Sequence, residues 1–291
     1  MNFDIYDELT KKNYGMTLKE LDENTVKGIK ANILKLRNSY KSNTPRTNYF
    51  NEEIRKAYML SYYPNYSEPI YELMDKYIKK ELEEKLNKKL KFTFFGAGPG
   101  AEVLGVSKYL CDINYEKQVE FILTDYEDGW NNQRNITKNL IQSLGSIKSN
   151  GLTYISGCDL TINCQKDCFE WKFCKSILYK SDVFIMQNCL NHIATSNTFY
   201  KNLLRRIDFM KEGSIFIIID FGYEISMNII KKLATEKKFE IISTNIFNKL
   251  IESRINDFIN EDIDKKIFSG EGLIRKKVTK YYYIIIKKVE K

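Results

Sequence analysis

The sequence contains no run of about 18 apolar residues, the length that would indicate a membrane-spanning helix. Its first eight residues, Met1 to Glu8, are polar and acidic, so no signal peptide is expected. No internal repeat and no long low-complexity linker is visible. We therefore expect a cytoplasmic protein that makes no contact with a membrane and has one large domain.

Histidine occurs once, at position 192, and none of the six cysteines forms a C-x-x-C pair. Four cysteines crowd between residues 158 and 174. Zinc sites prefer tight pairs, because two thiolates must converge on one ion at about 2.3 Å. The looser spacing here favours free thiols in a reducing compartment over a structural zinc, and no metal-binding residue is predicted.

The chain has little charge imbalance for its length. A net charge of +8 and a pI near 8.9 would assist the approach to a polyanion such as RNA, but lysine and glutamate are interspersed through most segments. With 291 residues the chain can bury a sizeable core and carry a smaller appendage. The charge alone does not identify a partner.

Proline is scarce, with four residues, and two of them suggest helix boundaries near the N-terminus. Pro64 is predicted to end a helix over residues 53–63, and Pro69 to begin another over 70–90. The first 88 residues are charged, show helical patterning and lack a glycine-rich motif. We predict a helical cap over residues 1–88 and a second domain over 89–291.

Tyrosine is abundant, and the segment 58–66 holds four of the 20 tyrosines. Tyr62 and Tyr63 precede the second domain, where their rings could line a ligand site. The alternative is that they pack the helices onto a sheet, since tyrosine buries a large area and keeps its hydroxyl hydrated. Packing is the favoured interpretation.

The most informative segment is an apolar strand that runs into a glycine-rich turn. Residues 92–95 are followed by Gly96, Gly98 and Gly100, and an amphipathic helix begins at about Ala101. Glycine adopts backbone conformations that are unfavourable for other residues, and its missing side chain lets main-chain amides reach a ligand. The pattern predicts a loop that binds a nucleotide-like cofactor.

This segment resembles motif I of the class I S-adenosylmethionine-dependent methyltransferases, whose G-x-G-P-G turn is matched by Gly96, Gly98, Pro99 and Gly100. The likeness covers about residues 90 to 220. It implies S-adenosyl-L-methionine as cofactor and an α/β fold: a Rossmann-like three-layer αβα arrangement, with a seven-stranded, mostly parallel sheet whose last strand is antiparallel, preceded by the helical cap.

Three further segments are similar to the family in the same order. Asp125 ends the strand 119–124, where the family places an acid on the ribose hydroxyls. Residues 157–160 match the segment at the adenine, and 182–188 match motif IV, which faces the methyl group. The resemblance predicts a cofactor site formed by Phe95, Gly96, Ala97, Gly98, Pro99, Gly100, Glu102, Asp125, Tyr126, Cys158, Asp159, Leu160, Gln187 and Asn188.

One departure concerns Phe94, which occupies a position where many family members have an acid that holds the cofactor amino group. Glu102, in the first turn of the following helix, is a candidate substitute. The same departure also suits a different hypothesis, in which the chain is a non-catalytic, methyltransferase-like binding protein.

A dinucleotide site is the main rival, because Gly96, Gly98 and Ala101 also satisfy G-x-G-x-x-G/A with Asp125 as the ribose acid. This would make the protein an NAD(P)-dependent oxidoreductase. Asp125, however, lies 29 positions after Gly96, whereas about 20 is usual for a dinucleotide site. Pro99 also suits a methyltransferase better. A glycine-rich turn without a ligand is the third interpretation.

Methyl transfer mainly requires an aligned acceptor and the exclusion of water. Asn188 and Asn191 are predicted to hydrogen-bond the acceptor, and His192 to remove a proton, with loop, cap or structural roles as alternatives. Cys189 is disfavoured as a nucleophile, since no basic partner can be named. The sequence does not identify the methyl acceptor. The form of motif I and the excess of basic residues favour RNA, and a small molecule or a protein is the alternative.

Overall fold

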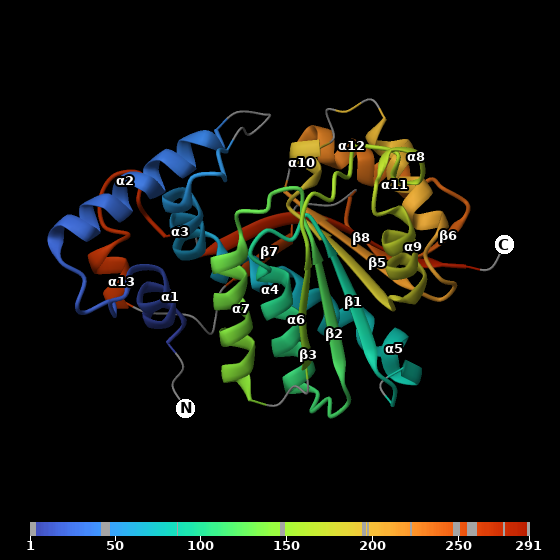
Figure 1. The fold of residues 1–291 in the computed structure, drawn as a ribbon, viewed down its shortest axis with the longest axis horizontal. Helices are drawn as coiled ribbons and strands as arrows, with labels where there is room; N and C mark the ends of the chain where they lie inside the picture. Colours follow the sequence, from blue (N-terminus) through green and yellow to red (C-terminus); the bar gives the residue numbers. More distant parts are fainter. Residues whose placement is uncertain are drawn as a thin grey trace.

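The computed structural model describes residues 4–41, 47–85, 87–145, 149–193, 196, 198–221, 223–246, 251–254, 261–275 and 277–289. Its centre is a twisted sheet with the strand order β3-β2-β1-β4-β5-β8-β6 (Figure 1). The strands are β1 (Leu90–Phe95), β2 (Val119–Thr124), β3 (Ser149–Ile155), β4 (Val183–Gln187), β5 (Ile215–Asp220), β6 (Phe239–Thr244), β7 (Ile251–Arg254) and β8 (Val278–Lys288).

The direction of the strands confirms the predicted fold class. Neighbouring strands from β3 to β5 are parallel, whereas β8 runs antiparallel to both β5 and β6. The last strand is therefore the antiparallel one, as expected from the resemblance. The short strand β7, which was not predicted, pairs with the other end of β8.

The central strands are buried on both faces, which explains their continuous apolar sequences. Side chains alternate along β4: Val183 and Ile185 join one hydrophobic core, whereas Phe184 and Met186 join the other. The carboxyl ends of β1, β2, β3 and β4 meet at one edge of the sheet, because these strands are parallel. Ligands bind at this edge in open α/β sheets.

Helices cover both faces, giving the three layers (Figure 1). One face carries α4 (Tyr63–Leu73), the π-helix η1 (Met74–Ile78), α5 (Lys79–Leu82), α6 (Ala101–Asp112) and α7 (Asn131–Leu144), and the short 3₁₀ helix η2 (Glu83–Lys85) leads into β1. The other face carries α8 (Cys164–Asp167), α9 (Trp171–Lys180), α10 (Leu190–Ile193), α11 (Phe199–Asp208) and α12 (Glu224–Leu233).

The remaining helices form a separate layer beside α7. These are α1 (Ile5–Tyr14), α2 (Glu23–Ser39), α3 (Glu52–Ser61) and, from the far end of the chain, α13 (Glu261–Lys266). Figure 1 shows α13 beside α1 and α2, and its residue Ile263, together with Ile267 directly after the helix, shares a hydrophobic core with them. Arg37 of α2 also donates a 2.6 Å hydrogen bond to the main-chain oxygen of Gly272. Sequence patterning did not predict this long-range packing.

The predicted end of a helix just before Pro64 is confirmed to within two residues, since α3 ends at Ser61, whereas the helix start predicted at Pro69 is wrong. Pro64 lies in the first turn of α4, where its missing N–H is no loss, and Pro69 lies inside the same helix. The chain turns instead at Tyr62, whose backbone leaves the helical region. Helix α4 persists through Pro69 because it packs closely on α6, where a Cβ atom at Gly105 would overlap the main-chain oxygen of Ser67.

Among the helices of the described residues, none is long and apolar enough to cross a membrane.

Candidate cofactor and acceptor pocket

The glycine-rich turn adopts the conformation that its sequence predicts. Gly96, Gly98 and Gly100 all have positive φ angles, of 61°, 50° and 89°. Space is restricted as well, because a Cβ atom at Gly96 would lie 2.9 Å from Cβ of Cys189, and one at Gly100 would lie 2.8 Å from Leu123. The turn therefore requires glycine at these two positions for both conformation and packing.

Neighbouring elements hold the turn in place. The main-chain N–H of Ala97 donates to the oxygen of Thr124 at 3.1 Å, at the end of β2. Two side chains of α7 donate to the other side of the turn: Arg134 Nε to the oxygen of Gly98 at 2.9 Å, and Thr137 Oγ1 to that of Pro99 at 2.7 Å. These hydrogen bonds within the protein therefore fix the conformation of the turn.

Asp125 lies at the end of β2 and connects three segments. Its carboxylate accepts hydrogen bonds from the main-chain N–H groups of Gly98 (2.6 Å) and Glu127 (2.8 Å). Its main-chain oxygen accepts one from Cys158 at 2.9 Å, which places the segment after β3 beside it. Burial raises the pKa of Asp125, and the two N–H groups act in the opposite direction.

The segment after β4 forms the opposite wall of the pocket. Asn188 has a positive φ of 55°, which asparagine tolerates better than most residues. The main-chain N–H of Leu190 donates to the buried carboxylate of Asp220 at 2.8 Å, so that β5 fixes the start of α10. Burial raises the pKa of Asp220 to about 7, and the hydrogen bonds that it accepts oppose this shift.

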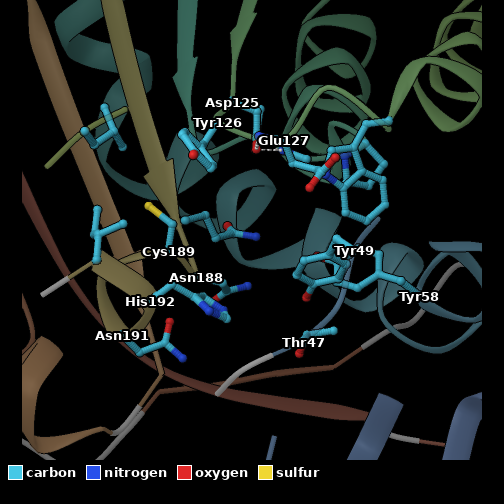
Figure 2. A pocket seen from close by; sticks show the side chains of 18 of the residues that line it. Thr47, Tyr49, Tyr58, Asp125, Tyr126, Glu127, Asn188, Cys189, Asn191 and His192 are labelled. Atoms are coloured by element: carbon cyan, nitrogen blue, oxygen red, sulfur yellow. Dashed lines mark hydrogen bonds between the residues drawn. The ribbon is translucent and has the colours of Figure 1, made fainter. Parts of the chain in front are cut away.

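These walls enclose a pocket of about 500 Å³, within the usual range for small-molecule sites (Figure 2). Most of its lining comes from the segments at the carboxyl ends of β1, β2, β3 and β4 and from the cap. It is lined by Tyr40, Thr47, Tyr49, Phe50, Tyr58, Tyr66, Gly96, Ala97, Gly98, Pro99, Glu102, Asp125, Tyr126, Glu127, Trp130, Cys158, Asp159, Leu160, Thr161, Gln187, Asn188, Cys189, Asn191, His192, Ile193 and Phe221.

Most of the residues proposed from the sequence lie at this pocket, and two do not. The lining includes the three proposed acceptor-side residues Asn188, Asn191 and His192. Phe95 is buried in the hydrophobic core, where its ring stacks on Phe184, and Gly100 packs against Leu123 behind the turn. Neither residue lines the pocket in this structure.

The two residues at the methionine end of the proposed cofactor site have different environments. Phe94 is 1% exposed and packs in the core with Phe92 and Phe121. Glu102 lines the pocket, is 6% exposed, and its Oε2 atom has no hydrogen-bond partner among the described residues. Burial raises the pKa of Glu102 to about 8, and the nearby Asp125 adds to this shift.

A second buried acceptor atom lies at the end of β4. The side-chain Nε2 of Gln187 donates to the main-chain oxygen of Tyr66 at 2.6 Å, which fixes the orientation of the amide. Its Oε1 atom has no partner within the described part of the chain. Together with the Oε2 atom of Glu102, it suits a ligand that carries N–H groups, because buried acceptors left unpaired are unfavourable.

Sequence reasoning missed the aromatic part of the pocket. Tyr62 and Tyr63 are packed among helices and do not line it, in agreement with the favoured interpretation, whereas Tyr58 and Tyr66 of the same segment do. Further aromatic residues come from separate elements: Tyr40, Tyr49, Phe50, Trp130 and Phe221. The only sequence signal was the high tyrosine content, which does not say which rings converge.

The cysteines occupy ordinary environments for thiols. Cys158 lines the pocket, and burial raises its pKa to about 11. Cys164 accepts a hydrogen bond from Arg206 at 2.8 Å, and burial raises the pKa of Cys189 well above its usual value. In the described residues, no group of three or more His, Cys, Asp and Glu side chains is arranged to hold a metal ion.

Comparison with protein families and with curated proteins found no match. Solved structures with a similar arrangement include several methyltransferases. A proposed class I S-adenosylmethionine-dependent methyltransferase from Listeria monocytogenes is 12% identical, with 98% of this chain and 80% of that chain covered and a TM-score of 0.49.

Two others were solved with S-adenosylhomocysteine bound. The N-methyltransferase NodS from Bradyrhizobium japonicum WM9 is 7% identical, with 89% of this chain and 99% of that chain covered and a TM-score of 0.41. The plantazolicin methyltransferase BpumL, whose structure also contains a monoazolic desmethylPZN analogue, is 11% identical, with 92% of this chain and 99% of that chain covered and a TM-score of 0.42. At these identities and TM-scores the likeness carries no conclusion about function, and we infer the function from the pocket of this protein.

Proposed function

We propose that this protein is an S-adenosylmethionine-dependent methyltransferase, with residues 1–88 as a helical cap and 89–291 as the cofactor-binding domain. The observation that carries the proposal is the convergence of the glycine-rich turn, Asp125 and the segment after β3 on one pocket. These are the segments in which the sequence resembles the family, and they are far apart along the chain.

The residues at the pocket suit the cofactor. Asp125 would take the ribose hydroxyls, and the segment Cys158 to Leu160 would bind the adenine. Glu102 would hold the amino group, since it lines the pocket, its Oε2 atom has no hydrogen-bond partner among the described residues, and an acid is missing at Phe94. When bound, the cofactor supplies a methyl group that its sulfonium has already activated.

The chain's own residues would then position the acceptor. Asn188 and Asn191 would hydrogen-bond the acceptor atom, and the imidazole of His192 would receive a proton when the acceptor is a hydroxyl. The acceptor stays a prediction, with RNA favoured by the sequence and a small molecule or a protein as the alternative. A cytoplasmic location also stays a prediction.

Calorimetric titration with S-adenosylmethionine and S-adenosylhomocysteine, with NADH in parallel, tests the proposal. We expect saturable binding of the first two ligands and its loss in Gly98→Asp, which adds a carboxylate beside the turn. Gly15→Asp is the matched control, because Gly15 also has a positive φ, of 74°, and has open space around it. Binding of NADH alone would identify a dinucleotide site, and binding of none of the three would refute the proposal.

A further inference from the structure

The pocket has two chemically different regions (Figure 2). At one end lie Asp125, Tyr126 and Glu127, beside the glycine-rich turn. At the other end, Tyr49, Tyr58 and Thr47 face Asn188, Asn191 and His192 across the cavity. The first end holds the residues proposed to bind the cofactor. We call the second end the acceptor region and define it by Tyr40, Thr47, Tyr49, Tyr58, Asn191 and His192.

Aromatic rings form a continuous wall in the acceptor region. Tyr49 lies 5.1 Å from Trp130 and 6.0 Å from Tyr58, measured between ring centroids. The hydroxyls of Tyr40 and Tyr49 are hydrogen-bonded to each other, and the ring of Tyr40 meets that of His192 edge-on at 6.3 Å. Tyr40, Tyr49 and Tyr58 remain partly exposed, so their surfaces are available to a ligand in the pocket.

None of the six described residues that define the acceptor region carries a permanent charge. No lysine or arginine is among the described residues that line the pocket. Arg55 and Arg134, which lie behind the walls, donate to the main-chain oxygens of Tyr49 and Gly98. Burial raises the pKa of Tyr40 and Tyr58 well above the usual value, so both phenols stay neutral at physiological pH.

The aromatic, uncharged lining of the acceptor region favours some chemical classes of acceptor over others. Phosphates and carboxylates are recognised by lysine, arginine and helix N-termini, and proteins that bind RNA neutralise its backbone with basic side chains. The pocket instead contains four carboxyl groups, those of Glu102, Asp125, Glu127 and Asp159, all outside the acceptor region. Those of the four that are ionised would repel an anionic acceptor, whereas a flat, neutral ring would stack on tyrosine faces.

We infer that the acceptor is a small, uncharged aromatic molecule that presents a hydroxyl group in the acceptor region. The inference rests on the proposed function, which supplies the methyl donor. The acceptor oxygen forms a bond to the methyl carbon, the electron pair of the broken carbon–sulfur bond stays on sulfur, and the hydroxyl proton passes to His192. The polar side chains beside the rings, Asn191 and His192, fit a hydroxyl at the reacting position.

Binding of model compounds to protein saturated with S-adenosylhomocysteine tests this inference without turnover. The probes are 2-naphthol, its anionic counterpart 2-naphthoate, its saturated counterpart decahydro-2-naphthol and a six-nucleotide single-stranded RNA. We expect measurable binding of 2-naphthol, at least about tenfold weaker binding of the saturated alcohol, and none of the other two. Preference for 2-naphthoate or RNA, or equal binding of the flat and saturated alcohols, would overturn the inference.

Variants locate the binding to the acceptor region. Tyr49→Leu should weaken 2-naphthol binding by about tenfold, whereas Tyr179→Leu, which removes a ring that is 67% exposed on α9, should not change it. Affinity for S-adenosylhomocysteine, measured on the same samples, checks that each variant is folded. If the wild-type protein binds S-adenosylhomocysteine but not 2-naphthol, the inference fails and the proposed function stands. If the wild-type protein binds neither compound, both fail.

Discussion

The carboxylate of Asp125 accepts a 2.6 Å hydrogen bond from the main-chain N–H of Gly98, and the two residues follow neighbouring strands of the sheet. This contact joins the acid at the end of β2 to the glycine-rich turn after β1. The other carboxylate oxygen accepts from Glu127, so one side chain organises both loops. The proposed ribose ligand therefore also shapes the turn that surrounds the cofactor.

We expect Asp125→Asn to weaken binding of S-adenosylhomocysteine by about tenfold to a hundredfold, because an amide offers one acceptor oxygen where the carboxylate offers two, and hydrogen bonds to charged groups contribute about 1.5–3 kcal/mol each. Calorimetry measures the change. Asp128→Asn, in the same loop but exposed and outside the pocket lining, should bind as the wild type does. Equal affinity of both variants would contradict the role given to Asp125.

Binding of S-adenosylmethionine should strengthen as the pH rises from about 6.5 to 8. The pKa of Glu102 is raised to about 8, and only its ionised form attracts an ammonium group. Above about pH 8 the amino group of the cofactor itself loses its charge, so the gain should end there. In Glu102→Gln this rise should disappear, whereas the exposed control Glu116→Gln should keep it. If the affinity of Glu102→Gln for S-adenosylmethionine still rises with pH, a residue other than Glu102 binds the ammonium group of the cofactor.

The same carboxyl group should make stability depend on pH in the opposite direction. Because folding raises the pKa of Glu102 from 4.5 to about 8, the folded protein binds more protons than the unfolded chain between these values. The free energy of unfolding should fall as the pH rises through this window, by at most about 1.4 kcal/mol per pH unit for this group. Urea unfolding of wild type and Glu102→Gln, without ligand, should show a shallower decline in the variant. If the free energy of unfolding falls equally with pH in both proteins, Glu102 makes no contribution to the pH dependence.

Replacing either of two helical glycines by alanine should change the stability of the protein, but in opposite directions. Gly105→Ala should destabilise the protein by about 1–3 kcal/mol, because the added methyl group would overlap the main-chain oxygen of Ser67 where α4 and α6 meet. Gly28→Ala, on the exposed side of α2 with no atom within 4 Å of the new Cβ, should stabilise it by about 0.5–1 kcal/mol. Thermal or urea unfolding would measure both. A similar effect at the two positions would contradict the packing described for α4.

Local sequence signals were sufficient for the sheet and the turn. The strand predicted over residues 119–124 coincides with β2, and the strand predicted to run into the glycine-rich turn is β1, which ends at Phe95. Their apolar, β-branched runs are bounded by polar segments, and each is recognisable without knowledge of its neighbours. The glycine-rich turn was equally clear, since positive φ angles select glycine at each position.

Helix boundaries near proline were less predictable. Pro69 lies within α4 although the sequence suggested a helix start. The reason is tertiary: close contact with α6 at Gly105 stabilises the helix and outweighs the local preference. The presence of α13 beside α1 and α2 could not be predicted either, because it depends on packing between opposite ends of the chain.

The sequence by itself determined the order of the strands along the chain, the glycine-rich turn and the acid that follows β2, because these depend on local conformation and spacing. Only the tertiary structure decided that Tyr40, Tyr49 and Trp130 meet at one pocket, since side chains from α2, the segment before α3 and the start of α7 converge only when the helices pack on the sheet. The same packing excludes water from Glu102 and raises its pKa, because burial disfavours the charged form.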